Sequence, residues 1–215
     1  GDGNGDTYLV QLVDDGGTDV IVPTVTDGTG AINAVDLLGF PEAFANSLEV
    51  LGSSDTDNLF ITETARGLPN FLGAAPNGHT NSALDDSGLT PNPPDVHYDG
   101  NGGADDTFEL TLITTHATAY FSDEVGTANS GVINIASSGF TMSFVDLAPL
   151  VLHGAGGTLT VDTTANTSVT QLDLDDEGST VDGSNQITGN GTFESVVLDG
   201  YASLDAYNGT DALPA

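Results

Sequence analysis

The sequence predicts an all-β protein, an antiparallel β-sandwich or barrel-like domain with a small helical insertion and a long Pro/Gly-rich loop. Three observations support this fold class. Short runs of Val, Ile, Thr and Phe alternate with clusters of Gly, Asp and Asn, strand candidates recur about every ten residues, and helical periodicity is scarce. Since 38% of the 215 residues are hydrophobic, we expect one domain with its own core, covering residues 1–215.

The first third of the chain predicts a hairpin and then the helical insertion. Thr7–Val13 and Asp19–Val25 flank the turn sequence DDGG and are typical of paired antiparallel strands. The helical insertion covers about residues 33–65. It consists of one helix over Asn33–Leu51, broken near Pro41, and a shorter helix over Asn58–Ala65.

A long loop and a series of strands follow. The loop covers about residues 67–106 and contains five prolines, and loops of this length are usually functional or organised by a metal ion. Thr107–Phe121 is the longest strand candidate, in which Phe108, Leu110 and Leu112 fall on one face. The remaining predicted strands are Gly131–Ala136, Phe140–Asp146, Leu150–His153, Thr158–Asp162, Ser168–Leu174, Gln186–Thr188, Thr192–Leu198 and Ala202–Ala206.

Two segments resemble the nonapeptide repeat of calcium-binding β-rolls in their order of Gly, Asp and apolar residues. They are GNGDTYLV, near the start of the chain, and GGADDTFEL, which ends the long loop. The complete nonapeptide repeat of calcium-binding β-rolls is absent, so two similar segments do not predict a solenoid.

Charge is the dominant compositional feature. The chain has 25 Asp and 7 Glu against a single basic residue, Arg66, which gives a formal net charge of −31. Nucleic acid is excluded as a direct partner, because binding it needs basic residues, and for the same reason direct docking on anionic lipid is disfavoured. Two interpretations remain open: a surface adapted to high salt, or acids that bind cations. Because Asp in Gly-rich loops suits oxygen coordination, the excess of Asp over Glu favours calcium.

The long loop ends in the best candidate calcium site. Its hard oxygen donors are Asp99, Asn101, Asp105, Asp106 and Glu109, within the Gly-rich segment DGNGGADDTFE. The alternative is a solvated approach to a hairpin.

Two weaker candidates lie elsewhere in the chain. Asp2, Asn4 and Asp6 have the alternate spacing that opens an EF-hand loop, but Thr7 and Val13 occupy positions that require Gly and Glu. In QLDLDDEG, a strand would direct its leucines inward and place Asp173, Asp175 and Glu177 along the outer face. A frayed acidic terminus and a screened outer face are the respective alternatives.

The sequence argues against an enzyme and assigns no catalytic residue. No nucleophile elbow, P-loop or dinucleotide motif is present, and the four histidines lack zinc-ligand spacing. The absence of Trp disfavours a glycan-binding surface, although 32 acids keep a glycosidase pair open. Arg66 is expected to pair structurally with Glu63 or a neighbouring Asp.

Several features favour an extracellular location. The chain has no Cys, starts without Met and contains no apolar run of membrane-spanning length, which is typical of a mature chain after signal cleavage. Three sequons, at Asn166, Asn190 and Asn208, would lie in surface loops if they were glycosylated.

These features together predict a secreted, calcium-stabilised structural protein of a cell surface or extracellular matrix. It would associate with itself into a filament, fibre or surface layer, or with other surface proteins, through strand edges. The alternative is a module of a large calcium-dependent adhesin, and less favoured are a salt-adapted secreted hydrolase and a glycan-binding module.

Overall fold

The structure is a computed structural model, and its description covers most of the chain. The described residues are 5–26, 40–41, 47–53, 55–69, 95–101, 106–122, 130–147, 149–176, 184–191 and 193–208. The calcium-site candidates Asp2, Asn4, Asp105 and Glu177 lie outside these ranges.

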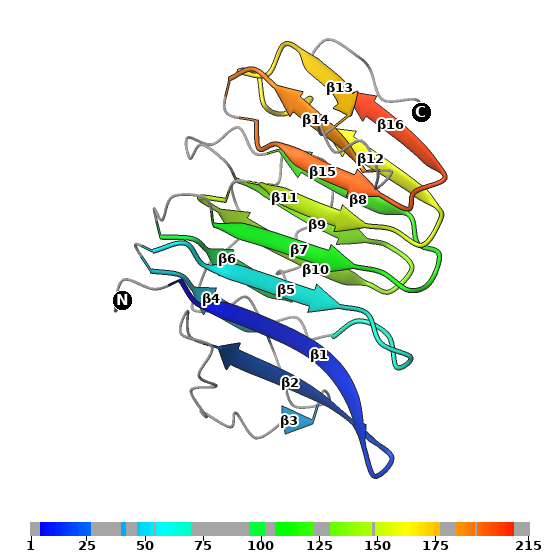
Figure 1. Cartoon of the computed structure of the whole chain (residues 1–215). Coiled ribbons are helices and arrows are strands. Elements are labelled where there is room, and N and C mark those ends of the chain that lie inside the picture. The colour runs from blue at the N-terminus through cyan, green and yellow to red at the C-terminus, as the bar shows by residue number, and fades with distance from the viewer. Residues whose placement is uncertain are drawn as a thin grey trace.

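Two β-sheets lie face to face (Figure 1). Sheet A contains, in spatial order, β13 (Leu172–Asp176), β14 (Asn185–Gly189), β15 (Val196–Asp199), β11 (Leu150–His153), β7 (Thr107–Thr111), β5 (Asn58–Thr62), β1 (Thr7–Asp15), β2 (Thr18–Thr26) and β3 (Phe40–Pro41). Sheet B contains β16 (Ser203–Tyr207), β12 (Thr158–Asp162), β8 (Thr118–Ser122), β9 (Gly131–Ile135), β10 (Phe140–Val145), β6 (Val96–Asp99) and β4 (Leu48–Leu51).

The prediction of an antiparallel sandwich or barrel is wrong, because both sheets are mixed. In sheet A the central pairs are parallel, whereas in sheet B the outer pairs are parallel and β9 is antiparallel to both β8 and β10. In sheet A, β1, β5, β7, β11 and β15 are parallel neighbours. After β5 the chain passes through β6 in sheet B before it returns as β7, and this crossover makes β5 and β7 parallel. Short strands with alternating burial occur in either arrangement, so the pattern that predicted strands could not fix their direction.

The helical insertion is also wrong wherever the structure describes it. Within residues 33–65 the described segments form β3, β4 and β5, and no helix occurs among the described residues of the chain. In β5 the side chains of Leu59 and Ile61 are buried and alternate with half-buried neighbours, which is the period of a strand. The predicted loop over residues 67–106 likewise contains β6.

Several strand predictions are confirmed. β1 and β2 form the expected hairpin, whose turn uses Gly16 and Gly17 at positive φ. Phe108, Leu110 and Leu112 are all buried on one face. The long candidate Thr107–Phe121 is divided into β7 and β8, and residues 112–117 form the connection between the two sheets.

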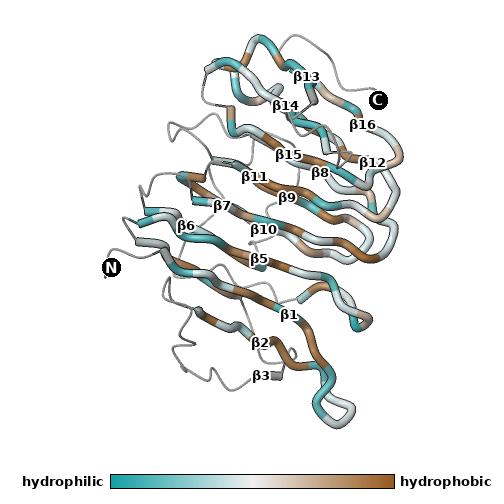
Figure 2. Tube along the Cα trace, viewed as in Figure 1, coloured by the Kyte–Doolittle hydropathy of each residue, from teal (hydrophilic) through white to brown (hydrophobic). Residues whose placement is uncertain are grey.

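The core lies between the sheets and consists of side-chain rows that cross the parallel strands. One row in sheet A joins register partners on successive strands: Val10, Ile61, Leu110, Leu152 and Leu198. All five are buried. Figure 2 shows hydrophobic and hydrophilic residues alternating along the central strands. Each strand therefore adds one layer to the same core.

Candidate functional site

An aspartate stands immediately before each of three successive parallel strands of sheet A. Asp6, Asp57 and Asp106 precede β1, β5 and β7, and we call them the aspartate ladder. The backbone N–H of Asp6 donates to Oδ1 of Asp57 (2.7 Å), and the N–H of Asp57 donates to Oδ1 of Asp106 (2.6 Å). Asp57 and Asp106 are completely buried. Each of these two carboxylates therefore ties one strand to the next.

Backbone hydrogen bonds help to compensate the ladder carboxylates for the loss of water. Oδ2 of Asp57 accepts a hydrogen bond from the backbone N–H of Ser53, and a bond to a carboxylate is stronger than one between neutral groups. The negative charge still affects its surroundings. Burial raises the pKa of Tyr8 to about 12, with smaller contributions from Asp57 and Asp6, and burial with the charges of Asp106 and Asp57 raises the pKa of Tyr98 as well.

The ladder also explains a glycine in the predicted calcium segment. A Cβ on Gly100 would lie 2.4 Å from the carbonyl oxygen of Asp146 and 2.5 Å from Oδ2 of Asp106. Only glycine fits where these backbones approach so closely.

The structure gives the described residues of the principal predicted calcium site different partners. Asp106 belongs to the ladder, whereas Oδ1 of Asp99 accepts a local hydrogen bond from the N–H of Asn101 (2.7 Å). Glu109 lies on the outer side of sheet A, near His153. Among the described residues, no group of three or more His, Cys, Asp or Glu side chains is arranged to hold a metal ion. Because Asp105 lies outside the described ranges, the calcium site itself stays a prediction.

The described residues of the two weaker calcium-site candidates lie in different parts of the fold. Asp6 joins the ladder rather than a terminal loop. Asp173 and Asp175 are exposed on β13, at the edge of sheet A, where Asp173 accepts hydrogen bonds from the side chain of Gln171. The expectation that the leucines of this strand point inward is wrong for Leu174, which is 59% exposed.

A hydrogen-bonded chain of Ser137, His116 and Glu63 lies where three connections meet. Glu63 follows β5, His116 lies between β7 and β8, and Ser137 lies in the β9–β10 turn. Oγ of Ser137 is 2.6 Å from Nδ1 of His116, and Nε2 of that ring is 2.9 Å from Oε1 of Glu63. These three residues could not be grouped from the sequence, because they are far apart in it and match no motif.

Glu63 is held in place by several donors. Its oxygens accept hydrogen bonds from the N–H groups of Ile113 (2.7 Å) and Thr114 (2.8 Å) and from the Thr114 hydroxyl (2.6 Å). Burial acts to raise the pKa of Glu63, but the hydrogen bonds from Thr114, His116 and Ile113 outweigh it, so the pKa lies below its usual value. Glu63 is therefore a fixed carboxylate beside the imidazole.

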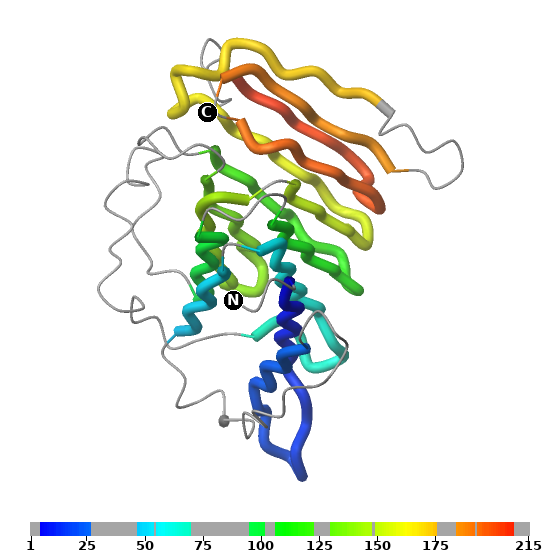
Figure 3. The backbone as a smooth tube through the Cα atoms, turned by 60° about the vertical axis from the view of Figure 1, so that its left-hand side comes forward, coloured from blue at the N-terminus to red at the C-terminus, as the bar shows by residue number. Residues whose placement is uncertain are grey.

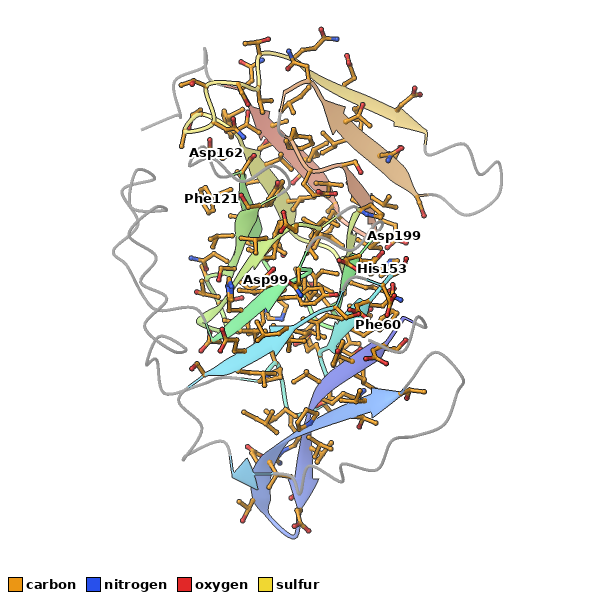
Figure 4. The ribbon with its side chains drawn as sticks, turned by 90° about the vertical axis from the view of Figure 1, so that its left-hand side faces the viewer. Phe60, Asp99, Phe121, His153, Asp162 and Asp199 are labelled. Carbon is orange, nitrogen blue, oxygen red and sulfur yellow. The ribbon has the colours of Figure 1, made fainter. Side chains whose placement is uncertain are left out.

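A second histidine lies between two acids on the outer side of sheet A. Nδ1 of His153 is 3.0 Å from Oδ2 of Asp199, and its Nε2 is 3.6 Å from Oε1 of Glu109. The three side chains come from the adjacent strands β7, β11 and β15, and each is about one-third exposed. Figure 4 shows His153 and Asp199 side by side, on the side of the molecule that also carries Phe60. The arrangement is an open cross-strand cluster of one imidazole and two carboxylates rather than an enclosed site.

Both ends of the two-sheet stack are grooved. At the C-terminal end, a groove of about 270 Å³ is lined by residues of β13 to β16 and the β15–β16 turn, among them Leu174, Leu198 and Leu204. At the other end, a groove of about 170 Å³ is lined by residues of β1, β2 and β4, including Val10 and Leu51. Figure 3 shows the C-terminal strands at the end of the stack opposite the β1–β2 hairpin.

Two further predictions concern single residues. Arg66 pairs with Asp19, a residue of β2, and not with Glu63; its Nε donates to Oδ1 of Asp19 (2.6 Å). The sequon residue Asn166 is 1% exposed and its amide donates to Oγ of Ser122, so it does not lie in a surface loop.

Within the described ranges, no helix has the length and apolarity that a membrane span requires. Comparisons of the chain with protein-family models, with curated proteins and with solved structures find no match.

Proposed function

We propose that this protein is an extracellular structural subunit that assembles head to tail through the two ends of its β-sheet stack. The observation that carries this proposal is that each end has a groove with one exposed leucine in its lining, mainly apolar beside β4 and mixed polar and apolar beside β13. Leu51 lines the groove beside β4 and Leu174 lines the groove beside β13, and each is 59% exposed. Contiguous apolar surface is typical of protein–protein contacts, and beside β4 the exposed Leu51 adjoins Leu48 and Val10 in the groove lining.

Strand direction makes a head-to-tail contact geometrically consistent. In sheet B the two edge strands, β4 and β16, run in the same direction, because β9 alone is reversed. A second copy placed on the end of the first could therefore add its β4 beside β16 as one more parallel strand. Such a contact joins two different surfaces and leaves the partner's far end open, so it generates a filament rather than a closed dimer.

The acidic surface supplies a reason why assembly would depend on cations. Asp173, Asp175 and Asp205 lie on the edge strands of one end, and Glu49 lies on the edge strand of the other. Repulsion between these ends in a chain of net charge −31 opposes their approach. Calcium is the cation we propose, because it can bridge carboxylates of neighbouring copies, whereas sodium only screens them.

Sedimentation velocity and negative-stain electron microscopy of the purified chain test this proposal. We expect monomers in EDTA at low salt and filaments in millimolar calcium, with weaker assembly in NaCl of equal ionic strength. Leu51→Asn and Leu174→Asn should each prevent filament growth, since each disrupts one of the two contact surfaces. A mixture of the two variants should form dimers and nothing longer, because only one intact contact remains.

Ile113→Asn is the matched control. Ile113 is 52% exposed but lines neither end groove, so this variant should assemble like the parent chain. Homodimers of Leu51→Asn alone would show a symmetric contact and contradict head-to-tail assembly. A parent chain that stays monomeric in calcium would contradict the proposed function itself.

An adhesin module is the second candidate, and the same end grooves favour it. In that case the neighbouring copy would be the next module of a longer chain. Two copies joined by a flexible linker would then form a compact pair, and Leu51→Asn in the second copy should separate them without any calcium-dependent filament in the single domain.

A further inference from the structure

The hydroxyl of Ser137 is hydrogen-bonded to an imidazole that is itself held by a buried carboxylate. Ser137 is exposed in the β9–β10 turn, His116 is half-buried, and Glu63 is buried behind them. The order from solvent to interior is therefore hydroxyl, imidazole, carboxylate. This is the order that an activated serine requires.

The partners of His116 determine which ring nitrogen carries the proton. Glu63 is ionised at neutral pH, because its pKa is below its usual value, and can only accept hydrogen bonds. Thr114 donates its own hydroxyl proton to Glu63, so its oxygen accepts from Nε2 of His116 at 2.7 Å. Nε2 therefore bears the hydrogen, and Nδ1 presents a lone pair to the Ser137 hydroxyl.

We infer that Ser137 is a nucleophile, with His116 as its general base and Glu63 as the positioning residue, and that it is acylated by small neutral esters. This activity is separate from the proposed assembly, because the chain of residues lies in connections that line neither end groove.

The reaction balances without a cofactor. Oγ of Ser137 attacks the ester carbonyl carbon while its proton passes to Nδ1 of His116. The C–O bond to the leaving alcohol then breaks, and the imidazolium returns the proton to the departing oxygen. Water repeats the sequence on the acyl-serine, which releases the acid and restores the hydroxyl, so the sum is ester plus water to acid plus alcohol.

The surroundings of Ser137 limit the substrate class. Its backbone N–H donates to no other described residue and is free to approach a developing oxyanion. The nucleophile stands in an exposed turn that lines neither described groove, so a short acyl group would reach it more readily than a long chain that needs a tunnel. The net charge of −31 repels anionic substrates, which favours uncharged esters.

The first measurement is active-site labelling of the full chain with a fluorophosphonate probe, with the modified residue located by peptide mass spectrometry. We expect Ser137 to react about 100-fold faster than other exposed serines, which is the low end of what a general base contributes. p-Nitrophenyl acetate should be hydrolysed with a burst of one equivalent or less. Ser137→Ala should abolish both signals, and His116→Gln should slow labelling of Ser137 about 100-fold.

Two controls distinguish a structural role of the Ser137–His116–Glu63 chain from a catalytic one. Ser143 also bonds a histidine, His97 (2.8 Å), but both are buried, so this pair should not be labelled. Glu63→Gln should slow labelling while Glu63→Asp partly restores it, with circular dichroism verifying that each variant is folded. Labelling of Ser137 at the rate of Ser203, or unchanged labelling in a folded His116→Gln variant, would overturn the inference.

Discussion

Glu194 and Glu63 show how two buried glutamates of one chain differ according to their donors. Both are almost inaccessible to solvent. Glu63 accepts hydrogen bonds from two backbone N–H groups and two side chains. Among the described residues, no donor is well placed for either carboxyl oxygen of Glu194. Burial raises the pKa of this residue to about 8, and the neighbouring backbone N–H of Ser195 opposes the increase only in part. The first is an anion that stabilises the fold, and the second is a neutral acid at pH 7.

Because Glu194 is protonated in the folded state, we expect the free energy of unfolding to decrease as the pH rises. The unfolded chain releases this proton near pH 4.3, whereas the folded protein keeps it to about pH 8, so the folded state binds more protons between these values. Relative to Glu194→Gln, the parent chain should lose stability across this window, by on the order of 5 kcal/mol. Urea unfolding of both proteins from pH 4 to 9 measures the difference, and parallel curves would contradict the prediction.

Glu63 predicts the opposite dependence. Its pKa is lowered in the folded state, so its contribution is complete above the unfolded pKa, near 4.3, and is lost as the pH falls through the lower folded-state value. Glu63→Gln should therefore be less stable than the parent at neutral pH, and the two should converge below pH 4. The same urea series, extended to pH 2.5, reports this convergence. A constant gap between the two proteins would assign the effect to lost packing instead.

At the scale of strands, the aspartate ladder gives the similar segments GNGDTYLV and GGADDTFEL a structural meaning. In both, the Asp-Thr step places an aspartate directly before a parallel strand, and Thr7 and Thr107 are both register partners of Asn58. The third member, Asp57 with Asn58, replaces the Thr and was not recognised in the sequence. The repeated unit is therefore an aspartate followed by a parallel strand, and each such unit adds one layer to the same core.

Replacing one aspartate of the ladder tests its contribution. Asp57→Ala would leave the N–H groups of Asp6 and Ser53 without their acceptor, and a buried unsatisfied donor costs about 1–3 kcal/mol. We expect thermal unfolding to shift down accordingly. Asp15→Ala removes the same charge from an exposed position at the end of β1 and is the control. A variant at Asp57 that is as stable as the Asp15 control would show that relief of repulsion offsets the lost bonds.

How far the sequence predicted the fold depends on the range of the interactions. Local signals located the β1–β2 hairpin and the buried face of β7, because turn glycines and alternation act within a few residues. Strand direction was not accessible, since it is set by crossovers through the other sheet. The helix expected over Asn58–Ala65 failed because Leu59 and Ile61 pack in rows shared with other strands, which local periodicity does not contain.

The candidate sites show the same limit. The sequence groups Asp99, Asp106 and Glu109 because they are close in the chain. In the structure Asp106 belongs to the aspartate ladder, Asp99 to a local turn and Glu109 to the outer face of sheet A, which a linear spacing does not contain. Ser137, His116 and Glu63 are brought together only by three connections at one end of the strands. Only the tertiary fold could reveal them.

At the scale of the whole molecule, repulsion among the acidic side chains destabilises the fold, while burial of the hydrophobic core stabilises it. The balance between the two determines the conditions under which the protein is folded. A single Arg cannot neutralise 32 acids, and the ladder hydrogen bonds compensate only the carboxylates that they contact. Two carboxylates about 6 Å apart in water repel by roughly 0.7 kcal/mol, and many such pairs act together on this surface. Folding of the monomer therefore depends on screening, while assembly requires that two acidic ends approach each other.

This difference predicts separate responses to sodium and to calcium. Thermal stability of the assembly-deficient Leu51→Asn variant should rise with NaCl and level off near 1 M, where the screening length is about 3 Å. Calcium at equal ionic strength should give a similar shift, because the described acids do not gather three at one site. In the parent chain, calcium should add a further shift that grows with protein concentration, since bridging then stabilises the contact between copies. Differential scanning calorimetry at two protein concentrations, with light scattering in the same samples, separates these contributions. A calcium shift in Leu51→Asn that NaCl cannot reproduce would instead place a specific calcium site within the monomer, and calcium would then stabilise the fold directly rather than the filament.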